Sequence, residues 1–152
     1  FMLKCKIVHP SRDDERRIMN RFTRKLDVEL NAVMSRDQIF AMRQVLDQVY
    51  CDEKVGDYIL DIVFATRTPE EFGLEIKHQI EYGASPRATL YLNLAARANA
   101  MLMGRAFATP QDVKDVAHDV LRHRIILTYE AEAEDVGSED VIDRILDTIP
   151  VP

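Results

Sequence analysis

The feature that most constrains this fold is a series of segments with helical periodicity, each preceded by a residue that favours a helix N-terminus. Behind Ser35, apolar residues recur every three or four positions through 36–49, which places them on one face of a helix. The starts at Ser85-Pro86 and Thr109-Pro110 are the strongest, because a hydroxyl residue followed by proline matches the N-cap and first helical positions. The pattern predicts a mainly α-helical bundle. Its helices are expected near residues 12–24, 36–49, 53–66, 86–103, 110–124 and 139–149, the last of them capped by Ser138.

Residues 3–8 show a different pattern, in which apolar and charged side chains partly alternate as in a strand. The pattern ends at Pro10, and no second convincing strand follows. Because a lone strand cannot satisfy its backbone hydrogen bonds, we expect this one to belong to a sheet outside the chain. The chain opens with Phe1 rather than methionine, which we interpret as the start of a piece of a longer protein. We therefore expect a terminal strand and hinge over residues 1–10 and one helical domain over residues 11–152.

Charge and composition exclude several classes of protein. The net charge of −6 argues against a general nucleic-acid binder, which needs a basic surface. No apolar run approaches the roughly 18 residues that a membrane span needs, and the first residues are too charged for a signal peptide. We therefore expect a cytoplasmic protein without membrane or nucleic-acid partners. Cys5 and Cys51 lie far apart and are interpreted as reduced, partly buried thiols.

The sequence lacks the motifs of an independent catalyst. None of its five glycines precedes a lysine, so there is no phosphate-binding P-loop. His118 and His123 are five residues apart and diverge by about 140° around a helix, so we expect no metal site there. The acidic stretch from Tyr129 to Gly137 lacks the spacing of a calcium loop and is expected to be a solvated turn. The chain alone is therefore not expected to catalyse a reaction.

Arg87 is the residue that stands out. It lies in the first turn of the predicted helix that starts at Pro86, where a cation faces the positive end of the helix dipole. The unpaired N–H groups of a helix start, together with an arginine, form a ready site for an anion. From the residues alone, two interpretations stay open: an arginine that contacts an anion and an arginine that points into solvent.

The string Gly83-Ala84-Ser85-Pro86-Arg87-Ala88 resembles the sensor 2 motif of MoxR-family AAA+ ATPases. The chain as a whole is similar to the C-terminal lid region of that family, which implies an AAA+ lid-like helical bundle with one short N-terminal strand left from the core sheet. The similarity covers essentially the whole chain. It extends through residues 1–4, 10–15, 104–113 and 120–125.

The resemblance implies a role for each residue of the motif. Arg87 would be the sensor 2 arginine, which contacts the γ-phosphate of ATP in the cleft between lid and core, while Ser85 and Pro86 shape the helix start. The P-loop, the Walker B acid and the sensor 1 residue would precede Phe1, so ATP and Mg²⁺ are expected in the complete parent protein and not on this chain alone. The parent would be an ATPase whose lid rotates about a hinge near His9-Pro10-Ser11 when the γ-phosphate is lost.

The resemblance also implies partners. These are the AAA+ core domain of the same protein, further copies in a ring, and client proteins that the ring remodels or matures in a chaperone-like way, often with a von Willebrand A domain. Two other hypotheses stay open. The chain could be a stand-alone helical module that binds a protein in a groove between the helices at 36–49 and 53–66. It could also read DNA through the 109–124 helix, using Lys114, Arg122 and Arg124, although its charge argues against this.

Overall fold

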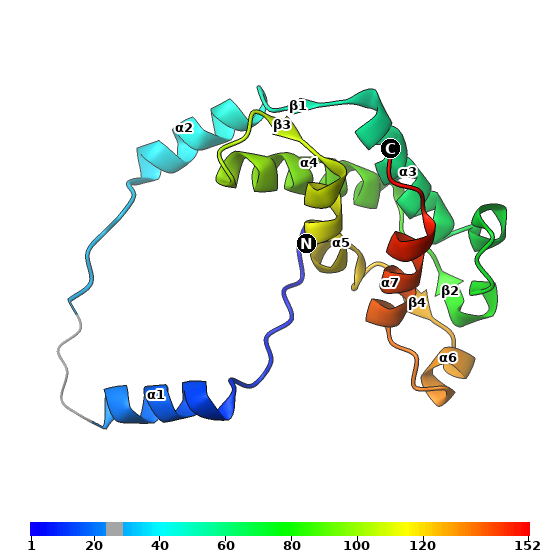
Figure 1. Ribbon diagram of the computed structural model, residues 1–152, viewed down its shortest axis with the longest axis horizontal. Helices are drawn as coiled ribbons and strands as arrows, with labels where there is room; N and C mark the ends of the chain where they lie inside the picture. Colours follow the sequence, from blue (N-terminus) through cyan, green and yellow to red (C-terminus); the bar gives the residue numbers. More distant parts are fainter. Residues whose placement is uncertain (24–28) are drawn as a thin grey trace.

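The structure is a computed structural model that describes residues 1–23 and 29–152 (Figure 1). The predicted mainly α-helical fold is confirmed. The α-helices are α1 (Arg12–Phe22), α2 (Arg36–Leu46), α3 (Glu53–Ala65), α4 (Pro86–Leu102), α5 (Pro110–Leu121), α6 (Tyr129–Ala133) and α7 (Ser138–Thr148). Two 3₁₀ turns lie at Pro69–Phe72 and Lys77–Gln79. The strands are β1 (Tyr50–Cys51), β2 (Ile80–Tyr82), β3 (Phe107–Ala108) and β4 (Ile126–Leu127).

Most helices begin where their capping residues predicted. Ser11, Ser35, Asp52 and Thr109 each accept a hydrogen bond from a backbone N–H of the first turn that follows. At α2 the cap is reciprocal, because the side chain of Gln38 also accepts from the backbone N–H of Ser35 at 2.7 Å. These contacts involve neighbours in the chain only, and for that reason the helix starts could be predicted from the sequence.

Two predictions near the C-terminus are wrong. The N-cap of α7 is Gly137 rather than Ser138, and the Gly137 N–H donates to the Asp140 carboxylate at 2.7 Å. The segment predicted as an acidic turn contains α6, a five-residue helix capped by Thr128. The side chain of Thr128 also donates to the carbonyl of His78 at 2.8 Å. This long-range contact anchors a helix that is too short to show periodicity of its own.

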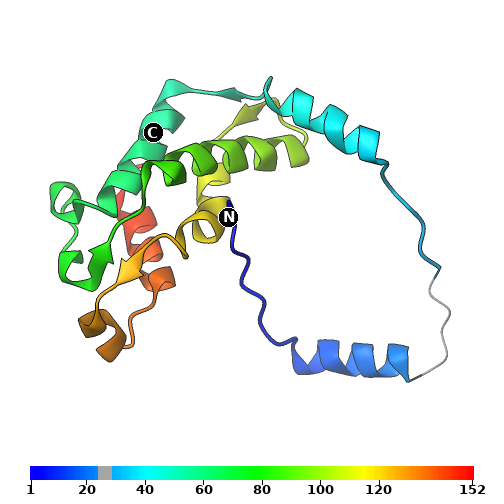
Figure 2. The ribbon, with the colours of Figure 1, turned by 180° about the vertical axis from the view of Figure 1, so that it is seen from behind.

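The core is built by α3, α4, α5 and α7. These helices pack in pairs, α4 against both α3 and α5, and α7 against α3 and α5 (Figures 1 and 2). Their inward side chains are fully buried, for example Ile62, Leu92, Val120 and Ile142. Alanines of α4 are buried as well, and their small side chains allow neighbouring helices to approach closely: Ala88, Ala95, Ala96 and Ala100. The chain therefore forms one continuous hydrophobic core over residues 49–149.

Short strands tie the loops of this core together, contrary to the prediction of a single strand. β1 runs parallel to β3, and β2 runs antiparallel to β4. Each strand has only two or three residues, so none is long enough to show the alternation that identifies a strand in a sequence.

Residues 1–10 form no strand within this chain, and a strand of residues 3–8 in a sheet outside it stays a prediction. No ladder forms along this segment, and its first residues instead follow the end of α5. The Lys4 N–H donates to the carbonyl of Asp119 at 2.8 Å, and the guanidinium of Arg122 donates to the carbonyl of Lys4. A strand requires a neighbouring backbone along its whole length, whereas the end of α5 makes isolated hydrogen bonds with this segment.

The helices α1 and α2 contribute no buried residue to the core. Figures 1 and 2 both show α1 apart from the packed helices, with the chain leaving them and returning through α2. The apolar side chains Ile18, Met19 and Phe22 of α1 are exposed. None of the helices within the described residues has the length and apolar character that a membrane crossing requires.

The cysteines are both free thiols, in two different settings. Cys5 is exposed, not partly buried as predicted. Cys51 is half-buried, and this burial raises the pKa of its thiol. Asn93 donates a hydrogen bond to its sulfur at 3.3 Å.

Candidate functional site

The candidate site is the start of α4. Pro86 is the first helical residue, and Ser85 takes the extended N-cap conformation, with φ −75° and ψ 168°. The Ala88 N–H donates to the carbonyl of Ser85 at 2.8 Å, which closes the first turn. The predicted start is confirmed, but the hydroxyl of Ser85 makes no capping hydrogen bond. The first turn of α4 is thus left without the side-chain acceptor that caps α1, α2, α3 and α5.

Arg87 lies in this turn with an exposed side chain. Within residues 1–23 and 29–152 it takes part in no hydrogen bond or ion pair, whereas Arg105 and Arg122 are both engaged by carboxylates. The guanidinium of Arg87 is therefore accessible to an anion from outside the chain.

The electrostatics of α4 differ from those of the other described α-helices. Each of the others has an Asp or Glu in its first turn, and α4 has none. A carboxylate at that position would partly neutralise the positive end of the helix dipole. At α4 the dipole, the uncapped N–H groups and the Arg87 cation all favour a negatively charged ligand.

The backbone just before this turn is attached to the end of α3. The buried N–H of Ala84 donates to the hydroxyl of Thr66 at 2.9 Å, and Nε of Arg67 donates to the carbonyl of Ala84 at 2.7 Å. Gly83 is required by the same approach, because a Cβ there would lie 2.3 Å from the carbonyl oxygen of Thr66. The sequence analysis missed Thr66 and Arg67, which lie 17 or more residues from their partner and belong to no motif.

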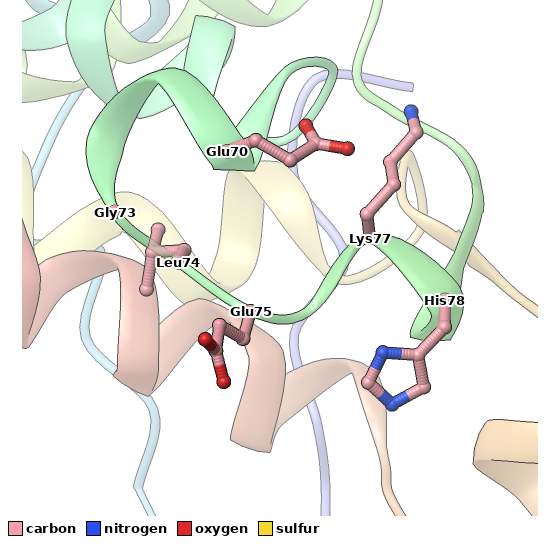
Figure 3. A pocket seen from close by; sticks show the side chains of 6 residues that line it. All are labelled: Glu70, Gly73, Leu74, Glu75, Lys77 and His78. Atoms are coloured by element: carbon pink, nitrogen blue, oxygen red, sulfur yellow. The ribbon is translucent and has the colours of Figure 1, made fainter.

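A separate hollow of about 690 Å³ lies in the segment that joins α3 to β2 (Figure 3). Figure 3 shows that Glu70 and Glu75 line it together with Lys77 and His78. The two carboxylates in this lining would repel a phosphate and offset the attraction of Lys77. None of the residues at the start of α4 lines this hollow. Volume alone therefore does not identify the site, and the chemistry favours Arg87.

The two histidines considered as metal ligands lie in different contacts. Nε2 of His118 lies 3.0 Å from Asp143 on α7, and Nε2 of His123 lies 3.3 Å from the carbonyl of Phe1. In the part of the chain that the structure describes, no three potential ligand residues gather around a common point.

The arginines proposed to read DNA are engaged in internal contacts. Arg122 is paired with Glu139 at 2.6 Å and with Asp119. The guanidinium of Arg124 lies 4.9 Å from the centre of the Tyr91 ring and donates to the carbonyl of Val120 at 2.9 Å. These contacts argue against the DNA-reading hypothesis, because neither arginine points freely outward.

The groove of the interaction-module hypothesis is also absent among the described residues. The apolar face of α3 is buried in the core, and α2 lies against α4 instead. An apolar hollow of about 470 Å³ lies between α2 and α4, with Met34, Met42 and Met101 in its lining.

Comparison with known proteins points to one family. The model of the AAA lid domain matches residues 74–145. Chaperone MoxR1 of Mycobacterium tuberculosis is 37% identical over all of this chain and 40% of its own length. Protein MoxR of Paracoccus denitrificans is 40% identical over 62% of this chain and 30% of its own length. The chain thus spans less than half the length of these relatives.

A solved structure agrees over the whole fold. The crystal structure of a candidate ATPase from Cytophaga hutchinsonii superposes on all of this chain and 47% of its own, with a TM-score of 0.93 and 36% identity. The match to the AAA lid domain and the similarity of Chaperone MoxR1 and of the solved structure over the whole of this chain lead to one assignment: the chain belongs to the MoxR family of AAA+ proteins, of which it forms the lid region.

Proposed function

We propose that this lid closes over ATP bound to an AAA+ core and that Arg87 is its sensor 2 residue, which contacts the γ-phosphate. The observation that supports this most directly is the accessible guanidinium of Arg87 at an α4 start that has neither a side-chain cap nor an acidic residue. An arginine suits the role because its planar fork can donate to two phosphate oxygens at once.

The residues of this chain fit one part of a nucleotide site. The start of α4 suits a phosphate, and the backbone of Ser85 and Pro86 fixes the helix start from which Arg87 extends. Phosphate binding by a P-loop and coordination of Mg²⁺ are the tasks of the core in this proposal. ATP bound there supplies the phosphoryl group, and Arg87 stabilises the negative charge on it during hydrolysis.

The lid also transmits the result of hydrolysis. Loss of the γ-phosphate removes the contact of Arg87, and the lid rotates against the core as a rigid body. We place the hinge at His9-Pro10-Ser11, a stretch of exposed residues between the contacts of Lys4 with α5 and the start of α1. In a cytoplasmic ring of such subunits, this motion would drive chaperone-like remodelling of client proteins, including proteins with a von Willebrand A domain.

The proposal is tested by Arg87→Ala in a polypeptide that joins this chain to its AAA+ core. We expect ATP turnover to fall by roughly 10²-fold, as when one donor to a developing negative charge is removed. Folding should survive, because the side chain of Arg87 is exposed. Steady-state phosphate release measures the first effect and thermal melting the second.

Arg36→Ala is the matched control, since Arg36 is an exposed arginine in the first turn of α2, next to Asp37. It should leave turnover unchanged. An Arg87→Ala variant with wild-type turnover would remove Arg87 from the mechanism.

A further inference from the structure

We propose that Thr66 and Arg67, at the end of α3, are positioning residues that hold the start of α4 so that Arg87 reaches the nucleotide. This inference rests on the proposed role of Arg87. It adds a connection between α3 and the nucleotide site that no motif of the sequence contains.

Thr66 holds the backbone by a buried hydrogen bond. Its hydroxyl accepts from the N–H of Ala84 at 2.9 Å and donates to the carbonyl of Val63 at 2.6 Å. The hydroxyl is therefore engaged both as an acceptor and as a donor. Thr66 and Ala84 are both almost completely buried, and water cannot replace the hydroxyl without entry into the core. A residue without this hydroxyl would leave the Ala84 N–H without a partner.

Arg67 holds the other side of the same peptide unit. Its Nε donates to the carbonyl of Ala84 at 2.7 Å, and its guanidinium stacks over the ring of Phe64 with 5.0 Å to the ring centre. Lys77 in turn donates to the carbonyl of Arg67 at 2.8 Å. Ala84 is thus held at both its N–H and its carbonyl, by two consecutive residues of one helix end.

Gly83 makes this attachment tight. Because a Cβ at that position would lie 2.3 Å from the carbonyl oxygen of Thr66 and 2.9 Å from Cγ of Arg67, the two backbones touch directly. Arg87 lies three residues beyond Ala84, in the first turn of α4. A displacement of the end of α3 therefore displaces the base from which the arginine extends, and small displacements of a catalytic group have large effects on rate.

The central test compares Thr66→Val, which removes the hydroxyl, with Thr66→Ser, which keeps it. In the polypeptide with its AAA+ core, Thr66→Val should lower ATP turnover about tenfold, and Thr66→Ser should keep it within about twofold of wild type. In this chain by itself, the Ala84 amide should exchange with solvent faster in Thr66→Val than in Thr66→Ser. Thr148→Val, which removes an exposed hydroxyl that donates to the carbonyl of Arg144 at the end of α7, should change neither quantity.

A double variant separates positioning from a general loss of stability. If Thr66 acts through Arg87, Thr66→Val should cause no further loss of turnover in an Arg87→Ala background. Arg67→Met, which keeps much of the side-chain stem, should show the same dependence and replaces Thr66→Val if that variant does not fold. The positioning role would be overturned if Thr66→Val lowered ATP turnover equally in the wild-type and Arg87→Ala backgrounds. It would also be overturned if Thr66→Ser were as slow as Thr66→Val. Neither result would affect the proposed role of Arg87. An Arg87→Ala variant with full turnover would overturn the proposed function as well.

Discussion

Two regions of this molecule have equally well-formed helices and very different packing. The packed unit, residues 49–149, contains α3 to α7 and the hydrophobic core, whereas the arm, residues 5–46 as far as the structure describes them, contains α1 and α2 without a buried residue. Helices of both regions begin at a residue whose side chain caps the first turn. The difference shows that capping and amphipathic spacing specify a helix, while attachment to a core requires a partner surface.

The arm is nevertheless anchored at both of its ends. Before it, Lys4 is held by the end of α5. After it, Arg97 of α4 donates to the carbonyls of Leu46 and Val49 at 2.7 and 2.8 Å. The Cytophaga hutchinsonii structure agrees with the whole of this chain, at a TM-score of 0.93.

The largest predicted difference between the two regions is the loss of stability when one apolar side chain is truncated in each of them. Leu92→Ala, in the core, should lower the free energy of unfolding by about 3–4 kcal/mol, because it leaves a cavity among fully buried neighbours. Ile18→Ala, on exposed α1, should change it by less than about 0.5 kcal/mol. Urea unfolding followed by circular dichroism measures both. A comparable loss from the two variants would show that α1 packs against the unit in solution.

A second comparison uses two aspartates at the same position of a capped helix. Asp112 of α5 is buried and accepts hydrogen bonds from Arg105, Thr109 and Asn99, while Asp14 of α1 is exposed. Burial by itself raises the pKa of Asp112, but these hydrogen bonds outweigh it and hold the pKa well below its usual range. Asp112→Ala should cost about 3 kcal/mol of stability, because several donors lose their acceptor.

Asp14→Ala is the control for this prediction. Its carboxylate interacts with Ser11 and Arg17 on the surface of α1, where water can take its place. The expected change is below about 0.5 kcal/mol in the same urea experiment. If the two aspartates proved equally important, burial would not distinguish the polar contacts of the two regions.

The smallest expected effect concerns the caps themselves. Ser35→Ala should weaken α2 locally by about 1 kcal/mol, seen as faster amide hydrogen exchange in α2, without a change in global unfolding. Thr109→Ala should instead lower the global free energy of unfolding by about 1 kcal/mol, since α5 belongs to the core. A global loss from Ser35→Ala would show that α2 unfolds together with the packed unit.

The start of the candidate site could be predicted because its chemistry is local. Ser85, Pro86 and Arg87 are consecutive, and their residue types alone indicate a helix start with a cation in its first turn. The exposure of Arg87, and the finding that no backbone N–H of the first turn donates to the Ser85 hydroxyl, required the structure. Thr66 and Arg67 could not be predicted, because nothing in the spacing of residue types relates the end of one helix to a loop 17 or 18 residues later.

The sequence by itself determined most of the helical segments, where most of them start, and that Arg87 lies in the first turn of α4, because capping, periodicity and the helix dipole act between residues a few positions apart. Only the tertiary structure decided which helices share a core, how the short strands pair, and that Lys4 contacts the end of α5. Those outcomes depend on surfaces that meet after the chain has folded back, and their partners are separated by tens of residues, beyond the reach of any local pattern.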